Sequence, residues 1–335
     1  MVGEDRVAEG HSGYHRVKQG GLPEPATDAN MTRQNQGGTQ MGPLASFAPP
    51  YAPSPDAPVG IFDSGVGGLS ILRHVRAQLP HEHLVYVADS GFAPYGDKPE
   101  DVVAERSLAI ARFLVARGAK ALVVACNTAT VSAVRLMRTR FPDLAIVGVE
   151  PGLKPAAAAS RNGKVGVLAT ERTLAGAKFL RLRDEIAQAS GAQFLLQPCQ
   201  GLADQIESGE LDSSATTAML KRYIAPLLAQ GVDTLVLGCT HYPLVQASIE
   251  KVIADEGFRD IVLVDTGEAV ARQLGRQLEA GGLMRPSSGA TSPARLEGYT
   301  SASATALSAA FNSLVGIDPP VFETRFEAAC TAGRI

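Results

Sequence analysis

Two cysteines stand in matching positions, each just beyond a run of apolar residues that predicts a buried strand. The first run reads Leu-Val-Val-Ala-Cys-Asn-Thr and the second Leu-Val-Leu-Gly-Cys-Thr-His, with the thiols at Cys126 and Cys239. This repeat predicts two similar halves of the molecule, each presenting one thiol from the carboxyl end of a strand. Two thiols that face one carbon atom can remove a proton from one side and return a proton on the other.

The residues that follow each cysteine strengthen this interpretation. A thiol at a helix N-terminus meets free backbone N–H groups and the positive end of the helix dipole, which lower its pKa. The same N–H groups, with the side chains of Asn127, Thr128 and Thr240, favour a substrate carboxylate. A single cysteine that ends a core strand is more often a small buried apolar residue. The matched pair favours catalysis, whereas Cys199 and Cys330 lack such surroundings and are interpreted as structural.

A glycine-rich segment, Asp63–Gly68, follows one predicted strand and precedes a helix. A dinucleotide site is one interpretation, and Asp89 stands near the place of a ribose-binding acid. However, the fingerprint Gly-x-Gly-x-x-Gly has Ser70 where its last glycine belongs. We therefore interpret Asp63 as a strand-end carboxylate that faces the active cleft, with the glycines permitting close backbone approach. On local grounds, a helix N-cap is an equally good interpretation of Asp63.

His241 lies two residues after Cys239, where it could assist proton transfer. A buried histidine bonded to the backbone is the more usual interpretation of such a residue. A zinc site made of Cys126, Cys239 and His241 is a further alternative, but the spacing typical of zinc ligands is missing and we expect no metal. The turn Pro94-Tyr95-Gly96 follows the second predicted strand, and its tyrosine hydroxyl could orient a polar ligand.

The scaffold for these residues is an alternation of short apolar strands and helices. Strands are predicted over 59–62, 84–88, 121–125 and 145–149, and again over 165–168, 194–197, 234–237 and 261–264. Such alternation predicts an α/β protein with parallel sheets, which bind ligands at the carboxyl ends of their strands. We expect two similar α/β domains related by pseudo-twofold symmetry, with the active site in the cleft between them. The first comprises residues 57–153 plus 263–335, and the second, inserted domain comprises 154–262.

Composition sets the class of protein. The chain has 335 residues, of which 45% are hydrophobic and 19% charged, and a net charge of −3. This balance makes nucleic acid and membranes poor candidates for a main partner, and cysteines without CxxC spacing fit a reducing compartment. Residues 1–56 are rich in Gly, Pro, Gln and Asn and are expected to form a disordered, non-secretory extension. Met31 and Met41 leave open a later translation start. We expect a cytoplasmic protein.

Several short blocks together resemble the bacterial glutamate racemases of the aspartate/glutamate racemase family. The specific blocks are Phe62–Gly68, Asp89 with Pro94-Tyr95-Gly96, Cys126-Asn127-Thr128-Ala129, Gly148-Val149-Glu150-Pro151 and Cys239-Thr240-His241-Tyr242-Pro243. Residues 169–173, 264–267 and 299–301 match more loosely. The resemblance covers about residues 57 to 320.

This resemblance implies an enzyme that interconverts L- and D-glutamate with neither pyridoxal phosphate nor metal, and so with no cofactor. Cys126 and Cys239 would serve as base and acid and exchange roles with reaction direction. The residues that would contact the amino acid are Asp63, Ser64, Tyr95, Gly96, Asn127, Thr128, Thr240 and His241, with Thr170 and Thr173 as further candidates. The resemblance also implies a homodimer, a supply of D-glutamate for peptidoglycan, and a cell-wall precursor as a candidate activator.

Removal of an amino-acid α-proton without an electron-sink cofactor requires preorganised donors in a dry cleft. Asp63 and His241 are the candidates for tuning or relaying protons beside Cys126 and Cys239. Two alternatives stay open. One is a related two-cysteine racemase acting on aspartate or a hydantoin. The other is a non-catalytic binding protein, because some glutamate racemases also bind DNA gyrase.

Overall fold

The computed structural model describes residues 53–286 and 293–326. Most of the predicted N-terminal extension lies outside the described residues, as do Met31, Met41 and Cys330. Within the described ranges, no helix combines the length and the apolar character needed to cross a membrane.

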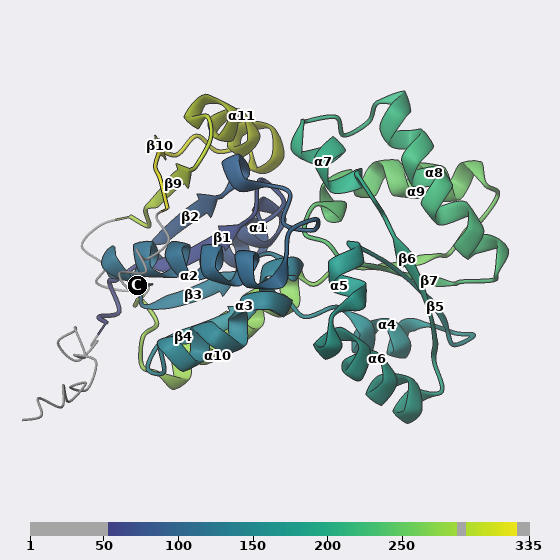
Figure 1. The fold of residues 1–335 in the computed structure, drawn as a ribbon, viewed down its shortest axis with the longest axis horizontal. Helices are drawn as coiled ribbons and strands as arrows, with labels where there is room; N and C mark the ends of the chain where they lie inside the picture. The colour runs from purple at the N-terminus through teal and green to yellow at the C-terminus, as the bar shows by residue number, and fades with distance from the viewer. Residues whose placement is uncertain (1–52, 287–292, 327–335) are drawn as a thin grey trace, which may run out of the picture. The chain divides into compact units, whose positions relative to one another are not determined.

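The first sheet has six parallel strands in the order β10-β9-β2-β1-β3-β4 (Figure 1). Apolar cores cover both of its faces, one built with α2 and α3 and the other with α1, α10 and α11. Its strands are β1 (Val59–Asp63), β2 (Leu84–Ala88), β3 (Ala121–Val124), β4 (Ala145–Gly148), β9 (Leu296–Thr300) and β10 (Val321–Glu323). Its helices are α1 (Leu69–Gln78), the 3-10 turn η1 (Ser90–Phe92), α2 (Glu100–Ala116), α3 (Asn127–Arg140), α10 (Gly267–Ala280) and α11 (Ala304–Val315).

The second sheet has four parallel strands in the order β6-β5-β7-β8. Its strands are β5 (Lys164–Ala169), β6 (Gln193–Pro198), β7 (Thr234–Leu237) and β8 (Val262–Val264). Its helices are α4 (Leu153–Ala159), α5 (Glu171–Ala175), α6 (Ala177–Ser190), α7 (Leu202–Glu207), α8 (Ser214–Ala229), the 3-10 turn η2 (Tyr242–Val245) and α9 (Gln246–Asp255). The prediction of an α/β fold with two parallel sheets is confirmed.

The two sheets share one strand order. Strands β2-β1-β3-β4 of the first sheet match β6-β5-β7-β8 of the second. Cys126 comes two residues after β3, and Cys239 comes two residues after β7, the strand in the corresponding position. The internal repeat that the cysteine segments predict is therefore a repeat of topology.

The structure extends or adds elements at several places. Helix α2 begins at Glu100 and continues to Ala116. Pro99 precedes it and acidic residues occupy its first turn, an arrangement that suits a helix N-terminus. The sequence does not predict strands β9 and β10, because β9 mixes polar and apolar residues and β10 has only three residues.

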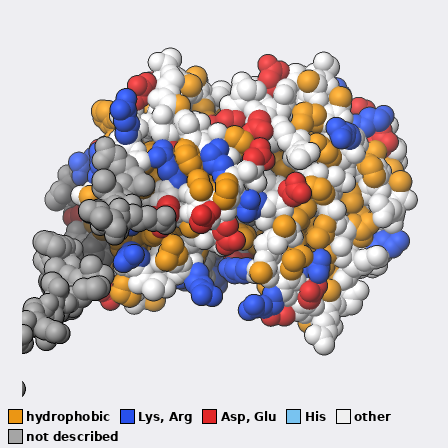
Figure 2. Space-filling view, in the orientation of Figure 1, with side chains coloured by type: hydrophobic (Ala, Val, Ile, Leu, Met, Phe, Trp, Pro, Cys, Tyr) orange, Lys and Arg blue, Asp and Glu red, His pale blue; other side chains and the backbone are white. Residues whose placement is uncertain are grey.

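The two places where the chain crosses from one sheet to the other are relevant to the predicted domain boundaries. Helix α4 packs against β7 of the second sheet, whereas α10 packs against α1 of the first. The chain therefore crosses between the sheets near 149–153 and again near 264–267. The exact domain boundaries stay a prediction. On the face shown in Figure 2, side chains of both charge signs are interspersed, in keeping with the small net charge.

Candidate active site

Both repeated cysteines line one narrow cavity of about 70 Å³, formed by loops at the carboxyl ends of strands from both sheets. Cys126 and Cys239 are 5% and 7% exposed. Eight further candidate residues also line the cavity, namely Ser64, Tyr95, Gly96, Asn127, Thr128, Thr170, Thr240 and His241. Two candidates, Asp63 and Thr173, are fully buried outside this lining.

Cys126 is the N-cap of helix α3. Its backbone is extended and its sulfur accepts a hydrogen bond from the Ala129 N–H at 3.5 Å. The thiol donates to Ser64 Oγ at 3.7 Å, and the Ser64 hydroxyl donates to Asp63 Oδ1 at 3.5 Å. The other Asp63 oxygen accepts from the Gly68 N–H at 2.6 Å. A hydroxyl thus connects this thiol to a buried carboxyl group.

Burial dominates the protonation of this side. The pKa of Asp63 is raised to about 6, because loss of solvent outweighs the attraction of His241 and the Gly68 N–H. Burial and the nearby Asp63 carboxylate raise the pKa of the Cys126 thiol above its ordinary value. The Ala129 N–H at the helix N-terminus does lower this pKa, as does the Ser64 hydrogen bond, but desolvation exceeds both effects and the net shift is upward, opposite to the expected one.

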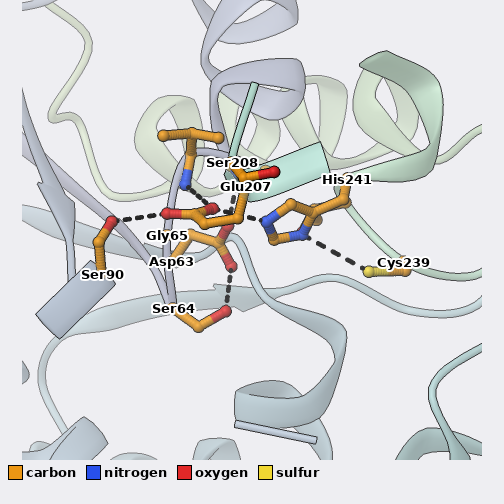
Figure 3. Close-up of polar contacts among 12 residues, drawn as sticks. Asp63, Ser64, Gly65, Ser90, Glu207, Ser208, Cys239 and His241 are labelled. Carbon is orange, nitrogen blue, oxygen red and sulfur yellow. Dashed lines mark hydrogen bonds and ion pairs between the residues drawn. The ribbon is translucent and has the colours of Figure 1, made fainter. Parts of the chain in front are cut away.

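Cys239 has a different kind of neighbour. It precedes the 3-10 turn η2 rather than a helix N-terminus, and its sulfur lies 3.7 Å from Nδ1 of His241. The other ring nitrogen of His241 lies 2.9 Å from Oε2 of Glu207, which belongs to α7 (Figure 3). An imidazole thus connects this thiol to a second carboxylate.

Glu207 also receives two hydrogen bonds from the first sheet. The Ser90 hydroxyl donates to Oε1 at 2.7 Å (Figure 3). The Val66 N–H donates to Oε2 at 2.7 Å. Although burial alone would raise it, the pKa of Glu207 is lowered by His241, Ser90 and Val66. Burial also opposes a charge on His241, but its hydrogen bonds to Cys239 and Glu207 raise its pKa well above the usual value. The raised pKa of His241 and the lowered pKa of Glu207 favour an ion pair between imidazolium and carboxylate on this side.

Besides the groups already described, the cavity wall includes the acidic residues Asp97, Glu171 and Asp204 and several uncharged donors and acceptors. Neither amide atom of the buried Asn127 side chain has a hydrogen-bond partner among the described residues, so both atoms are available to a ligand. Thr128 Oγ1 lies 3.2 Å from Thr170 Oγ1, which donates to Thr173 Oγ1 at 3.0 Å. Thr170 also caps α5. These hydroxyls connect the two sheets across the cavity.

Asp89 fixes the loop that carries Tyr95. Its buried carboxylate accepts hydrogen bonds from the Tyr95 hydroxyl at 2.7 Å and from two Arg106 nitrogens at 2.8 and 2.7 Å. Ser301 Oγ donates to it at 2.6 Å. These partners occupy the carboxylate, so Asp89 does not serve as the ribose-binding acid of a dinucleotide site. Its function is to hold Tyr95 in the cavity wall.

Comparison with known proteins decides the family. Residues 69–274 match the family model described as Asp/Glu/Hydantoin racemase. The chain belongs to this racemase family. It is 52% identical to a glutamate racemase of Ectopseudomonas mendocina over 245 residues, which are 73% of this chain and 89% of that protein.

Two solved glutamate racemases agree with the family fold. Isoform RacE1 from Bacillus anthracis has a TM-score of 0.71 at 27% sequence identity, covering 80% of this chain and 97% of that one. The Escherichia coli enzyme, solved with L-glutamate and the activator UDP-MurNAc-ala, has a TM-score of 0.66 at 31% identity. That match covers 79% of this chain and 97% of the E. coli chain.

The glycine-rich loop of this racemase family member fits a role other than dinucleotide binding. A Cβ atom at Gly65 would overlap the Glu207 carboxylate, and one at Gly67 would overlap the His241 ring. Ser70, the residue that breaks the fingerprint, has its Oγ 2.8 Å from the carbonyl oxygens of Gly67 and Thr240. The missing side chains in this loop allow Glu207 and His241, which belong to the half of the molecule with the second sheet, to approach its backbone closely.

The sequence analysis missed Glu207. Helix α7 has only six residues and carries a single pair of buried apolar residues at helical spacing, Leu202 and Ile206. An acidic residue directly after that pair was a usable, though weak, signal. Cys199 also lines the cavity, where its thiol donates to the Gln197 carbonyl, and its interpretation as a structural cysteine stays a prediction. Among the described residues, no group of three or more His, Cys, Asp or Glu side chains could hold a metal ion.

Proposed function

We propose that this chain interconverts L- and D-glutamate by a two-base mechanism in which Cys126 and Cys239 exchange the roles of base and acid. The observation that carries the proposal is the placement of two thiols from corresponding strand ends on one cavity, each connected to its own carboxyl group. The identity of 52% to a glutamate racemase supports glutamate as the substrate.

In the proposed reaction, one thiolate takes the α-proton and leaves an enolate-like carboxylate on the substrate. The opposite thiol then gives its proton to the other face of the same carbon, so the enzyme ends with thiol and thiolate exchanged. The free enzyme must therefore hold one thiolate and one thiol, and the direction of the reaction decides which cysteine carries the proton. Return of the free enzyme to its first state requires a net proton exchange between the two sides.

The cavity wall suits a substrate that gains charge at its carboxylate. Within the described residues its lining has neither Lys nor Arg, and its side-chain donors include the Asn127 and Gln200 amides, the His241 imidazole and threonine hydroxyls. We propose that Asn127, Thr128 and Thr240 bind the α-carboxylate, where preorganised donors stabilise the developing charge. Ser64, Tyr95 and Gly96 complete the contacts with the amino acid, and Thr170 and Thr173 support them.

Racemisation assays with a substrate panel test this proposal. L- and D-glutamate should be interconverted by the chain without added cofactor, and each cysteine-to-serine variant should lose the activity. Turnover of aspartate or a hydantoin in place of glutamate would favour the related-racemase alternative. Full cellular function of Cys126→Ser would favour the non-catalytic alternative. The proposed cellular role is supply of D-glutamate for peptidoglycan by a cytoplasmic homodimer whose domains correspond to the two sheets.

A larger cavity, of about 540 Å³, lies where the chain crosses between the sheets, lined by parts of α3, α4, α6 and α10. We propose it as the site for an anionic activator of the cell-wall precursor class, because its lining includes more cations than carboxylates. The cations are Arg138, Lys154, Lys178 and Arg276, and the carboxylates are Glu150 and Asp265. The E. coli relative was solved with such an activator.

Activation by UDP-MurNAc-Ala tests this second proposal. Arg276→Gln should raise the half-activating concentration about tenfold, because a hydrogen bond to a charged ligand is lost. Arg272→Gln is the matched control, since Arg272 lies on the same helix, pairs with Glu268 and does not line the cavity. A rate unaffected by the nucleotide would contradict the proposal.

A further inference from the structure

Ser90 has a contact that the two-cysteine mechanism does not by itself require. It begins η1 on the first sheet, yet its hydroxyl donates to Glu207 on α7, beside the second sheet (Figure 3). Ser90 is half-buried, and the Glu207 side chain is 20% exposed. A hydrogen bond to a carboxylate in such a place is worth more than an exposed one, because water competes for it less.

The segment that carries Ser90 is firmly attached to the first sheet. Its neighbour Asp89 is fully buried and bonded to Tyr95, Arg106 and Ser301. The next residue, Gly91, donates its N–H to Ser301 Oγ at 3.0 Å. Ser90 is therefore a preorganised donor whose position does not depend on Glu207.

The glycine loop completes a seat for the Glu207 carboxylate. The Val66 N–H donates to Oε2, and the missing side chain at Gly65 leaves the space that the carboxylate fills. Gly67 does the same for the His241 ring. Both members of the Glu207–His241 pair come from the second sheet, and the seat that receives them belongs to the first.

We propose that Ser90 is a positioning residue for proton transfer at Cys239. Together with the Val66 N–H it holds the Glu207 carboxylate against the glycine-rich loop, and Glu207 in turn orients His241 beside the thiol. Both donors belong to the first sheet, so separation of the two sheets would remove them together. Proton transfer at Cys239 is thereby coupled to closure of the cleft. Ser90 touches neither thiol and acts through Glu207. The inference rests on the proposed racemase function.

Kinetics of Ser90→Ala test the proposal. The variant should lower kcat/KM about tenfold, as expected for one hydrogen bond to a charged group. Because the two enantiomers have equal free energy, kcat/KM must fall equally in both directions. The diagnostic readout is therefore the primary deuterium isotope effect on kcat/KM for L- and D-[2-²H]glutamate. It should rise for the enantiomer whose α-deuteron leaves to Cys239 and fall for the other.

Three further variants separate positioning from general damage. Ser90→Thr keeps the hydroxyl and should restore most of the activity. Ser208→Ala removes a hydroxyl next to Glu207 that bonds the Gln205 carbonyl instead, and it should match wild type. Gly65→Ala pushes a methyl group into the carboxylate seat and should cost about a hundredfold or more, with isotope effects shifted in the same senses as in Ser90→Ala.

The proposal is overturned if Ser90→Ala stays within twofold of wild type, or if its two isotope effects move together. A wild-type chain that fails to racemise glutamate would instead reject the proposed function. The two failures are therefore distinguishable.

Discussion

The two sides of the cavity place a thiol in matching positions and surround it differently. Cys126 is connected through the Ser64 hydroxyl to Asp63, whereas Cys239 is connected through the His241 imidazole to Glu207. Each thiol therefore has one intermediary and one carboxyl group. The repeat of strand order places the sulfur atoms, and the loops that follow decide how each one handles its proton.

The two carboxyl groups differ in charge for a physical reason. Asp63 is fully buried and has few donors, so its pKa is raised to about 6. Glu207 has three donors, from His241, Ser90 and Val66, and its pKa is lowered. One side thus holds a carboxyl group that readily takes a proton, and the other holds a carboxylate paired with imidazolium. The difference suits a reaction in which a proton enters at one side and leaves at the other.

The largest expected effect comes from replacing either thiol, and the two replacements should have similar effects. Cys126→Ser and Cys239→Ser should each lower racemisation by about 10³-fold or more, because both proton transfers are needed for every inversion. Circular dichroism of the glutamate product measures this loss. A variant that kept a tenth of the activity would show that one thiol is dispensable.

Replacement of the neighbouring groups should separate the two sides. Asp63→Asn and His241→Asn should each cost about 10²-fold in kcat/KM. In the first variant the transfer at Cys126 becomes slower, and in the second the transfer at Cys239. Deuterium isotope effects with the two α-deuterated enantiomers should therefore shift in opposite senses between the variants. Identical shifts would mean that the groups do not serve separate thiols.

Asp63→Asn and Glu207→Gln should change the free energy of unfolding in opposite ways as the pH rises. Asp63 has a raised pKa, so its contribution is present below about pH 4 and lost as the pH rises through about 6. Asp63→Asn should therefore gain up to about 3 kcal/mol relative to wild type between pH 4 and pH 7. Urea unfolding at several pH values measures this difference, and a difference independent of pH would contradict the raised pKa.

Glu207→Gln is the counterpart on the other side. Because the pKa of Glu207 is lowered, its stabilising contribution is present at neutral pH and is lost as the pH falls below its ordinary range. This variant should be less stable than wild type at pH 7 and approach it in acid. The same urea titration provides the measurement, and a greater loss of stability in acid than at neutral pH would contradict the paired carboxylate.

The smallest expected effect concerns the hydroxyl contacts between the sheets. Thr170→Val removes the partner of Thr128 Oγ1 and the cap of α5. We expect KM for glutamate to rise about tenfold, with kcat changed less, because a neutral hydrogen bond and a cap contribute about 1 kcal/mol each. Initial-rate kinetics in both directions test this, and a change confined to kcat would contradict it.

Much of the scaffold was predictable because its signals are local. Strands such as β2 and β3 are continuous apolar runs with every residue buried, and the residues that follow such strands stand at one edge of a parallel sheet. The placement of Asp63, Asn127 and His241 near the two thiols follows from that rule. The family blocks supplied the substrate class, which strand periodicity alone does not contain.

The residues that could not be predicted depend on contacts between distant segments. Glu207 meets Val66 and Ser90, which lie far from it in the sequence, and its short helix lacks an extended apolar pattern. The raised pKa of Cys126 was missed for a related reason. Its helix N-terminus is visible in the sequence, but the burial that outweighs it is a property of the folded cleft.

Exchange of solvent deuterium into the α-position of L- and D-glutamate tests the two-thiol account most directly. The measurement uses wild type, Cys126→Ser and Cys239→Ser in D₂O without added cofactor, and follows the α-proton by NMR. The account predicts that wild type forms α-deuterated product from both enantiomers, and that each variant loses racemisation. Racemisation that persists in either variant, or product that retains the substrate's own α-proton from the start, would contradict it.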